Sequence, residues 1–272
     1  MLITTDGLIT RSYAAGEHDR LVHLVTPDRG RLAVMVKGGQ SKSNRFAPIT
    51  QLFTYGNFEL YRRGELYWLR GGSVNHSFYR LTADITRMAL GTYLCDITSE
   101  LTDEGEEGAG DLLRMLLNAL YVLEQGTHAP VIVKGVFELR AAAMSGYAPN
   151  LVACTLCGEG YPESSYLDVM NGCIVCADCQ TKLNRLGGSR TGGFLSDKAA
   201  EERGERHIIC PMTASTLAAI RYALTAPEKK IFSFALTDRE EEIMFDRLTE
   251  TYLLNHLERN FETLQFYHSV MT

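Results

Sequence analysis

The chain has 272 residues, of which 45% are hydrophobic and 22% charged, and its net charge at pH 7 is −6. These values are ordinary for a globular protein, and the lack of any run of 18 apolar residues argues against a membrane-spanning helix. The N-terminal residues show no basic region followed by an apolar stretch. We therefore expect no signal peptide, and we expect the seven cysteines to reside in a reducing compartment.

Charge is distributed unevenly along the chain. Residues 1–80 hold 11 Lys and Arg against 6 Asp and Glu, whereas residues 81–272 hold 16 against 27. A basic first segment favours a module that binds a polyanion, joined to a body with a different task. The alternative is the ordinary unevenness of surface charge.

Short apolar runs separated by turn residues predict strands in the basic segment. We expect them at residues 2–12, 21–25, 32–36, 52–61 and 66–69. Five short strands at this spacing indicate a small closed barrel such as an OB-fold, which we assign to residues 1–80.

The cationic side chains of this barrel are expected on strand ends and loops, where they can contact nucleic-acid phosphates. They are Arg11, Arg20, Arg29, Arg31, Lys37, Lys42 and Arg45. OB-folds bind single strands by combining such a positive groove with aromatic stacking. Tyr13 and Phe46, which we expect in loops, are the better stacking candidates, whereas Phe53, Tyr55 and Tyr61 are expected in the barrel core.

From residue 82 onward the apolar residues recur at helical spacing. Helices are expected at about residues 82–101, 112–125, 130–145, 213–225 and 237–259, packed as one bundle over 81–150 and 185–272. Thr237-Asp238-Arg239-Glu240 is interpreted as a capping box, and residues 187–193 as a flexible linker. The expected fold class is therefore α+β multidomain: an OB-fold barrel, then an all-α bundle with an inserted four-cysteine module at 151–184.

Five of the seven cysteines fall within residues 154–179. Two C-x-x-C pairs separated by 15 to 20 residues are typical of a tetrahedral zinc site. Cys154 and Cys157 form the first pair. The second is Cys173/Cys176 after a spacer of 15 residues, or Cys176/Cys179 after a spacer of 18.

Local sequence favours Cys176 and Cys179. Asn171-Gly172 predicts a tight turn, and residues 173–175 then predict a short strand leading into a metal-binding knuckle. Four thiolates close the coordination sphere, so this Zn²⁺ would be structural. Buried free thiols, disulfides and an iron–sulfur cluster are the alternatives.

Catalytic motifs are missing from the sequence. The seven histidines are scattered, and the P-loop, nucleophile-elbow and zinc-deaminase patterns do not occur. We therefore expect a protein that is not an enzyme. A nucleic-acid-modifying enzyme with a structural zinc, and a zinc-ribbon scaffold that binds RNA or proteins in transcription or translation, are the competing interpretations.

Four stretches of the barrel segment resemble the opening of the bacterial RecO family of recombination mediators. They are Gly7-Leu8-Ile9, the run from Glu17 to Val22, the run from Thr26 to Leu32, and Lys37-Gly38 with the loop to Arg45. The resemblance continues in order through the helical body and the cysteine module. The family's cysteine pattern places a glycine and two apolar residues before the third ligand. That pattern maps onto Gly172 and implies the ligand set Cys154, Cys157, Cys176 and Cys179.

Several functional expectations come from the resemblance. It implies binding of single- and double-stranded DNA, annealing of complementary strands, and help in loading RecA onto DNA coated by single-strand-binding protein, in the RecF pathway. It also implies RecR and the acidic C-terminal tail of single-strand-binding protein as partners, and a place in the bacterial cytoplasm near the nucleoid.

Overall fold

The computed structural model describes all residues except 1, 42, 65, 106–107, 186–207 and 272. The chain divides into two compact units: Met1–Pro130 with Phe261–Thr272, and Val131–Asn260. Among the described residues, no helix combines the length and the hydropathy that a membrane span needs.

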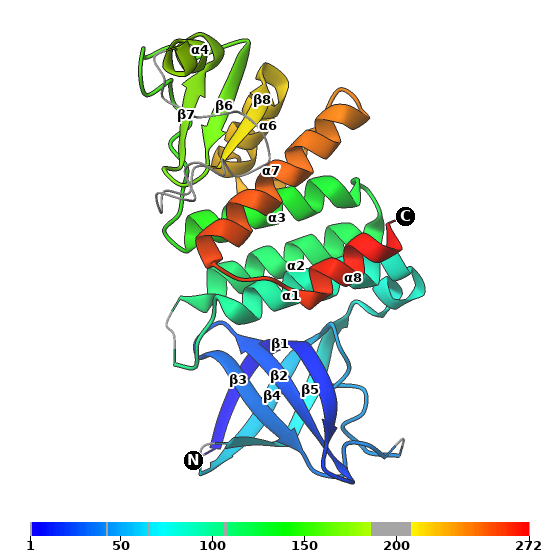
Figure 1. Ribbon diagram of the computed structural model, residues 1–272. Helices are drawn as coiled ribbons and strands as arrows, with labels where there is room; N and C mark the ends of the chain where they lie inside the picture. Colours follow the sequence, from blue (N-terminus) through cyan, green and yellow to red (C-terminus); the bar gives the residue numbers. More distant parts are fainter. Residues whose placement is uncertain (1, 42, 65, 106–107, 186–207, 272) are drawn as a thin grey trace. The chain divides into compact units, whose positions relative to one another are not determined.

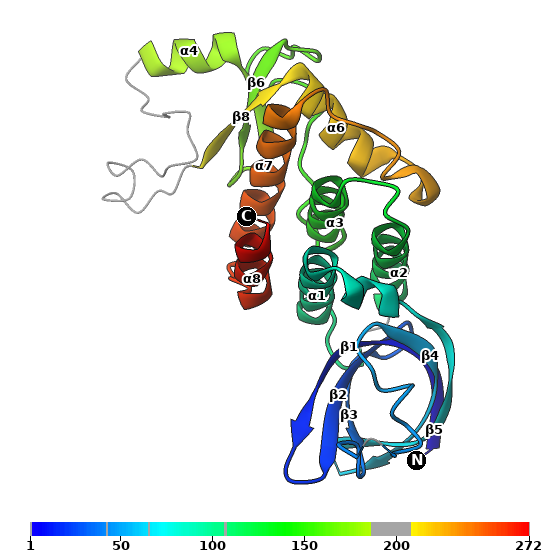
Figure 2. The same cartoon turned by 90° about the vertical axis from the view of Figure 1, so that its right-hand side faces the viewer.

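The first unit begins with a closed five-stranded barrel (Figure 1). Its strands are β1 (Leu2–Ala15), β2 (Asp19–Thr26), β3 (Gly30–Val36), β4 (Thr54–Arg63) and β5 (Leu66–Ser77). They pair in the order β1-β2-β3-β5-β4, and β3 and β5 run parallel while the other neighbours are antiparallel. Figure 2 looks along the barrel, so the strands form a ring. This arrangement confirms the expected OB-fold.

The barrel interior is a packed apolar core. Successive strand residues point to opposite sides, so in β3 Leu32, Val34 and Val36 are buried while Arg31 and Met35 lie on the outer face. The buried core comprises Ile3, Ile9, Val22, Leu24, Leu32, Val34, Val36, Ile49, Phe58, Leu60, Tyr67 and Leu69. Because side chains fill this interior, surfaces for binding lie on the outer face and the two ends.

Strand β5 is longer than the 66–69 segment predicted from the sequence. A Gly-Gly pair usually predicts the end of a strand, but β5 continues through Gly71-Gly72. The strand continues because these glycines allow its backbone to lie close to β4. A Cβ at Gly72 would approach the Asn57 carbonyl oxygen to 2.4 Å, and the register shifts nearby, between Glu59 and Leu60. Glycine therefore marks a close approach of two strands here and not a turn.

The remaining elements of the first unit are helical. They are η1 (Tyr79–Ala83), α1 (Ile85–Glu100), α2 (Ala109–Gln125) and α8 (Glu262–Val270). Asp84 caps α1 by accepting hydrogen bonds from Thr86 N and Arg87 N, and Gly126 ends α2 in the left-handed conformation. The sequence analysis did not predict α8, which packs along α1.

The second unit combines helices with a small sheet. Its elements are α3 (Pro130–Met144, whose first residue lies at the boundary), β6 (Ser164–Asp168), β7 (Cys173–Cys176), α4 (Ala177–Arg185), β8 (Ile209–Thr213), α6 (Ala214–Thr225), η2 (Glu228–Lys230) and α7 (Arg239–Leu257). The sheet order is β7-β6-β8. The sequence analysis predicted neither β6 nor β8. Strand β8 contains Pro211, which an edge strand tolerates.

The cap of α7 lies one residue later than predicted. Asp238, and not Thr237, is the N-cap, because its carboxylate accepts a hydrogen bond from Glu241 N at 2.9 Å. Glu241 accepts hydrogen bonds from the Ser215 hydroxyl and from Thr237 N. Two overlapping cap patterns are present in the sequence, and the contact with Ser215 favours the second. The predicted linker at 187–193 lies outside the described residues.

Candidate nucleic-acid interface and metal centre

One end of the barrel gathers several of the predicted DNA-binding residues. The antiparallel topology brings the β1–β2 turn to the same end as the segment that follows β3. Hydrogen bonds join them: Gln40 N donates to His18 O at 3.1 Å, and the Gln40 side chain donates to Gly16 O at 2.9 Å. We call this end the turn end.

Arg20, Lys37 and Arg45 lie at or next to the turn end. Arg20 donates to Gly39 O and to the Ser12 hydroxyl, and it lines a surface hollow of about 450 Å³. Lys37 and Arg45 are exposed. None of these three cations forms an ion pair with a carboxylate of the described residues. Lys42 lies outside the described residues.

Two of the other predicted cations already have carboxylate partners. Arg11 Nε lies 2.8 Å from Asp96 Oδ1, and Asp96 is only 4% exposed. The hydrogen bond to Asp96 is the largest influence on the pKa of Arg11, and it raises that pKa. Arg29 pairs with Asp28 at 3.3 Å, at the opposite end of the barrel, where its carbonyl accepts a hydrogen bond from Gly105 N.

Arg31 is half-exposed on the outer face of β3, two residues from Arg29. Burial, and after it the positive charge of Arg31, lowers the pKa of His23. The seven predicted cations therefore do not form one cluster. Arg20, Lys37 and Arg45 lie at the turn end, whereas Arg29 and Arg31 lie toward the other end.

The aromatic residues differ from their predicted positions. Tyr13 lies on β1 and not in a loop, and its ring meets His23 edge-on. Phe46 packs against the barrel core, with the Arg45 guanidinium 4.5 Å from its ring centroid, so it is not a free platform. Tyr61, which was expected in the core, is 38% exposed on the outer face.

The sequence analysis did not single out three exposed arginines of β4 and β5, namely Arg62, Arg63 and Arg70. Alternation with buried Leu60 and Leu69 was the available signal for Arg63 and Arg70, because that period places both on the outer face. Arg62 has the parity of Leu60, and its guanidinium lies over the Tyr67 ring.

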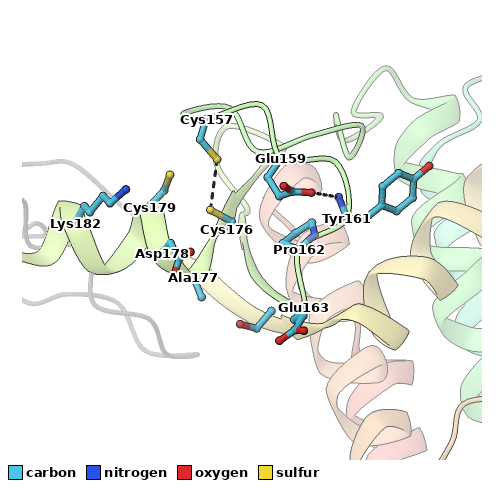
Figure 3. Close-up of a pocket in the computed structure, with 11 residues that line it drawn as sticks. Cys157, Glu159, Tyr161, Pro162, Glu163, Cys176, Ala177, Asp178, Cys179 and Lys182 are labelled. Carbon is cyan, nitrogen blue, oxygen red and sulfur yellow. Dashed lines mark hydrogen bonds between the residues drawn. The ribbon is translucent and has the colours of Figure 1, made fainter.

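The cysteine module brings four thiols together. The sulfur atoms of Cys154, Cys157, Cys176 and Cys179 all lie within 4.8 Å of one another. Cys157 and Cys176 are 3.6 Å apart, close to the separation of about 3.8 Å that two thiolates have on a tetrahedral zinc ion. Figure 3 shows these two side chains facing each other, with Cys179 on the adjoining helix. Four such thiols fit a structural metal ion.

Local backbone geometry supports this arrangement. Gly158 N donates to Cys154 O at 2.9 Å, and Gly158 has a φ of 80°, so the first pair closes a tight knuckle that favours glycine. The second pair spans the end of β7 and the first turn of α4. Cys173, at the start of β7, is not part of the four-thiol group.

The thiols are electrostatically unequal. Burial raises the pKa of Cys154, but hydrogen bonds from the backbone, first among them that of Cys176 N at 3.3 Å, outweigh it and lower this pKa to about 6. Hydrogen bonding to Cys176 and Cys157 raises the pKa of Cys179 to about 12. One thiolate is therefore formed readily, and a bound cation would be needed to keep all four deprotonated.

Comparison with known proteins agrees with the geometry. A family model described as "Recombination protein O N terminal" matches residues 1–78. A second, "Recombination protein O C terminal", matches residues 82–188. The barrel and the cysteine module both fall within the matched residues.

Curated relatives match over most of the chain. The DNA repair protein RecO of Acetivibrio thermocellus is 24% identical over 264 residues, which cover 97% of this chain and 95% of that protein. The DNA repair protein RecO of Streptomyces coelicolor is 29% identical over 218 residues, which cover 74% of this chain and 88% of that protein. On the two family models and these relatives, the chain belongs to the RecO family of DNA repair proteins.

Proposed function

We propose that this chain is a non-enzymatic mediator of DNA repair and recombination that binds single- and double-stranded DNA and anneals complementary strands. The single observation that carries the proposal is the turn end of the OB-fold barrel, where Arg20, Lys37 and Arg45 have no carboxylate partner among the described residues. Cations that no acid neutralises are available for phosphates.

The seven predicted cations are expected to contribute unequally. Lys37 and Arg45 would contact phosphates directly, with Lys42 in the same segment and Arg20 beside the hollow. Arg31 would extend the contact along β3. Arg11 and Arg29 would contribute less, because Asp96 and Asp28 already share their charge.

Annealing would follow from the same charges. Two complementary strands repel each other through their phosphates, and a basic surface that holds both lowers this repulsion. Pairing itself is then spontaneous, so the step needs neither ATP nor a catalytic residue. This reasoning supports the assignment as a non-enzyme.

The metal is proposed to be a structural Zn²⁺ held by Cys154, Cys157, Cys176 and Cys179. Thiolates favour zinc, and a closed set of four leaves no position for a substrate. The residues of this chain would position the knuckles, and the ion would supply the folding energy of the module.

The finer role rests on the family. We propose that the protein assists RecA loading on DNA coated by single-strand-binding protein, with RecR and the acidic tail of that protein as partners, in the RecF pathway. The corresponding location is the bacterial cytoplasm.

Single-stranded DNA binding against salt tests the proposal. The intact chain is compared with a triple variant, Lys37→Ala, Lys42→Ala and Arg45→Ala, and with a control triple that removes Arg185, Lys229 and Lys230, which are exposed in the second unit. We expect a steep salt dependence that becomes shallower only in the first variant, by about one unit of slope for each lost phosphate contact.

Strand annealing is measured next with the same proteins and complementary oligonucleotides, without ATP. The rate should fall with the first variant and not with the control. No binding, or equal loss in both variants, would contradict the proposal. A preference for RNA would favour the alternative of an RNA-binding zinc-ribbon scaffold, and turnover of a nucleic acid would favour an enzyme.

A further inference from the structure

Three neighbouring strands of the barrel present large apolar side chains on its outer face. Tyr61 of β4 lies opposite Trp68 of β5, and Trp68 lies opposite Met35 of β3. The three side chains therefore follow one register row across the sheet. We call them the outer row. The predicted DNA-binding set includes none of them.

The aromatic members of the outer row lie nearly parallel. The Tyr61 and Trp68 rings are stacked, with centroids 6.4 Å apart and an interplanar angle of 21°. Tyr61 is 38% exposed, and Trp68 and Met35 are partly exposed. A cross-strand aromatic pair stabilises a sheet by only about 0.2–1 kcal/mol. A contiguous row of partly exposed apolar side chains with a polar border is the kind of surface feature that marks a binding site, and two parallel rings suit a ligand that stacks.

Cations border the outer row on two sides. Arg63, opposite Leu66, lies one outward position beyond Tyr61 on β4. On the other side lie Lys37, just past the end of β3 and two residues after Met35, and Arg70, two residues after Trp68 on the outer face of β5. All three are exposed, and no ion pair joins them to a described carboxylate.

The charge around the outer row suggests a path for a polyanion. The Arg45 guanidinium approaches the Arg70 carbonyl oxygen at 3.5 Å, which brings the turn end to the edge of the row. Glu59 is the opposing charge: it lies two residues from Tyr61, with its carboxylate close to Gly71. A phosphate backbone would therefore pass over Lys37 and Arg70 at the β3–β5 side and avoid Glu59 on β4.

We propose that the outer row is a stacking surface for unpaired bases of single-stranded nucleic acid, with the phosphates held by Lys37 and Arg70. Stacking on aromatic rings with cations beside them is how sequence-independent single-strand binding works. Bases of a duplex already stack on each other, so this surface would add affinity for single strands alone. The inference rests on the proposed function and names the ligand state that this part of the barrel recognises.

Trp68 is the chain's only tryptophan, so its fluorescence reports on the outer row directly. The intact chain is titrated with an oligothymidylate and with an abasic oligomer of the same length and charge. A base stacked on an indole quenches its emission. The two oligomers are compared at the same fraction of bound protein, which fluorescence anisotropy measures. We expect the oligothymidylate to quench Trp68 emission and the abasic oligomer to quench it little.

Variants at Tyr61 separate stacking from general apolar contact. Tyr61→Leu should weaken binding of the oligothymidylate about five- to a hundredfold, whereas Tyr61→Phe should bind like the intact chain. Binding of the abasic oligomer and of duplex DNA should not change. Tyr121→Leu, at an exposed tyrosine on α2, serves as the control for folding and should have no effect.

The outcomes distinguish the two proposals. Salt-dependent DNA binding with equal quenching by both oligomers and no effect of Tyr61→Leu overturns the stacking surface but leaves the mediator function standing. The same follows if Trp68 emission depends on protein concentration without DNA, because the row would then be a protein interface. Absence of any single-strand binding overturns both.

Discussion

The barrel and the cysteine module keep their shapes in different ways. The barrel encloses twelve buried apolar residues contributed by all five strands and the segment before β4. The corresponding cluster of the module has four buried residues, of which three are the cysteines Cys154, Cys176 and Cys179. The candidate DNA ligands of the barrel are thus separate from its core, whereas the candidate metal ligands of the module are its core. Replacing a DNA ligand of the barrel should therefore weaken DNA binding without unfolding the barrel. Replacing a metal ligand of the module should abolish metal binding and unfold the module together.

The largest expected effect comes from removing a metal ligand. Cys176→Ser should abolish stoichiometric metal binding and unfold the module, because structural zinc contributes roughly 10–16 kcal/mol in small zinc modules. Elemental analysis would measure the loss of metal. Limited proteolysis would detect unfolding as new cleavage between residues 150 and 185. Chelation of the intact protein should reproduce the result.

Cys173→Ser is the matched control, since Cys173 is adjacent in sequence but outside the four-thiol group. It should keep one metal ion per chain. Cys176 belongs to both candidate pairs, so Cys179→Ser is the variant that distinguishes them. Retention of metal by Cys179→Ser together with its loss from Cys173→Ser would show that the Cys173/Cys176 pair binds the ion.

The second unit also has a charged core that does not involve metal. Lys134 Nζ, fully buried on α3, lies 3.0 Å from Glu138, 2.9 Å from Asp246 and 2.8 Å from Glu250. Lys134→Met should lower the free energy of unfolding by about 3–5 kcal/mol, because it leaves buried carboxylates without their cation. The double variant Lys134→Met with Glu138→Met should recover part of this loss in chemical denaturation. No recovery would mean that packing of the lysine stem, and not charge, is what matters.

The same cluster predicts a pH dependence. Burial raises the pKa of Glu138 from 4.5 to about 7, against the attraction of Lys134. The folded state then binds a proton that the unfolded state releases, so this group's contribution is fully present below pH 4.5 and is lost as the pH rises to about 7. Relative to Glu138→Gln, the intact protein should lose on the order of 1–3 kcal/mol over that range. A constant difference in unfolding free energy would argue against the raised pKa.

A smaller loss of stability is expected when a barrel cation that pairs with a nearly buried carboxylate is removed. Arg11→Ala removes the cation beside the nearly buried Asp96, which still accepts a hydrogen bond from the Thr263 hydroxyl at 2.8 Å. The unfolding free energy should fall by about 1–3 kcal/mol, as for a buried charge that loses a hydrogen bond. Denaturant unfolding measures this, and Asp96→Asn in the same background should reduce the penalty. Unchanged stability with a large loss of DNA affinity would place Arg11 among the DNA ligands.

The smallest change in stability is expected at the turn end. Lys37→Ala should alter the unfolding free energy by less than about 0.5 kcal/mol, since this exposed lysine has no described ion pair. It should nevertheless reduce the salt slope of DNA binding by about 1. Lys230→Ala is the control and should change neither quantity. A marked loss of stability at Lys37 would remove the distinction between the two regions.

Much of the candidate site could be predicted from the sequence because it depends on residues that are only a few positions apart. The C-x-x-C pairs, the turn at Asn171-Gly172 and the alternating pattern of β3 each involve residues a few positions apart. The stacking candidates were predicted poorly for the opposite reason. Whether Tyr61 faces the core or the solvent depends on the register of β4 against β1 and β5.

Pairing register and side-chain partners required the folded chain. Strand β8 has five residues and helix α8 has nine, and each is stabilised by a partner distant in sequence, β6 and α1 respectively. Arg11 and Lys37 are both exposed cations, but packing places Asp96 beside Arg11, whereas Lys37 forms no ion pair with the described carboxylates. Local pattern thus established the barrel and the cysteine spacing, because backbone periodicity and metal-ligand spacing are short-range properties. Which cations and rings remain available for a ligand was settled by long-range contacts, because burial and charge pairing depend on residues far apart along the chain.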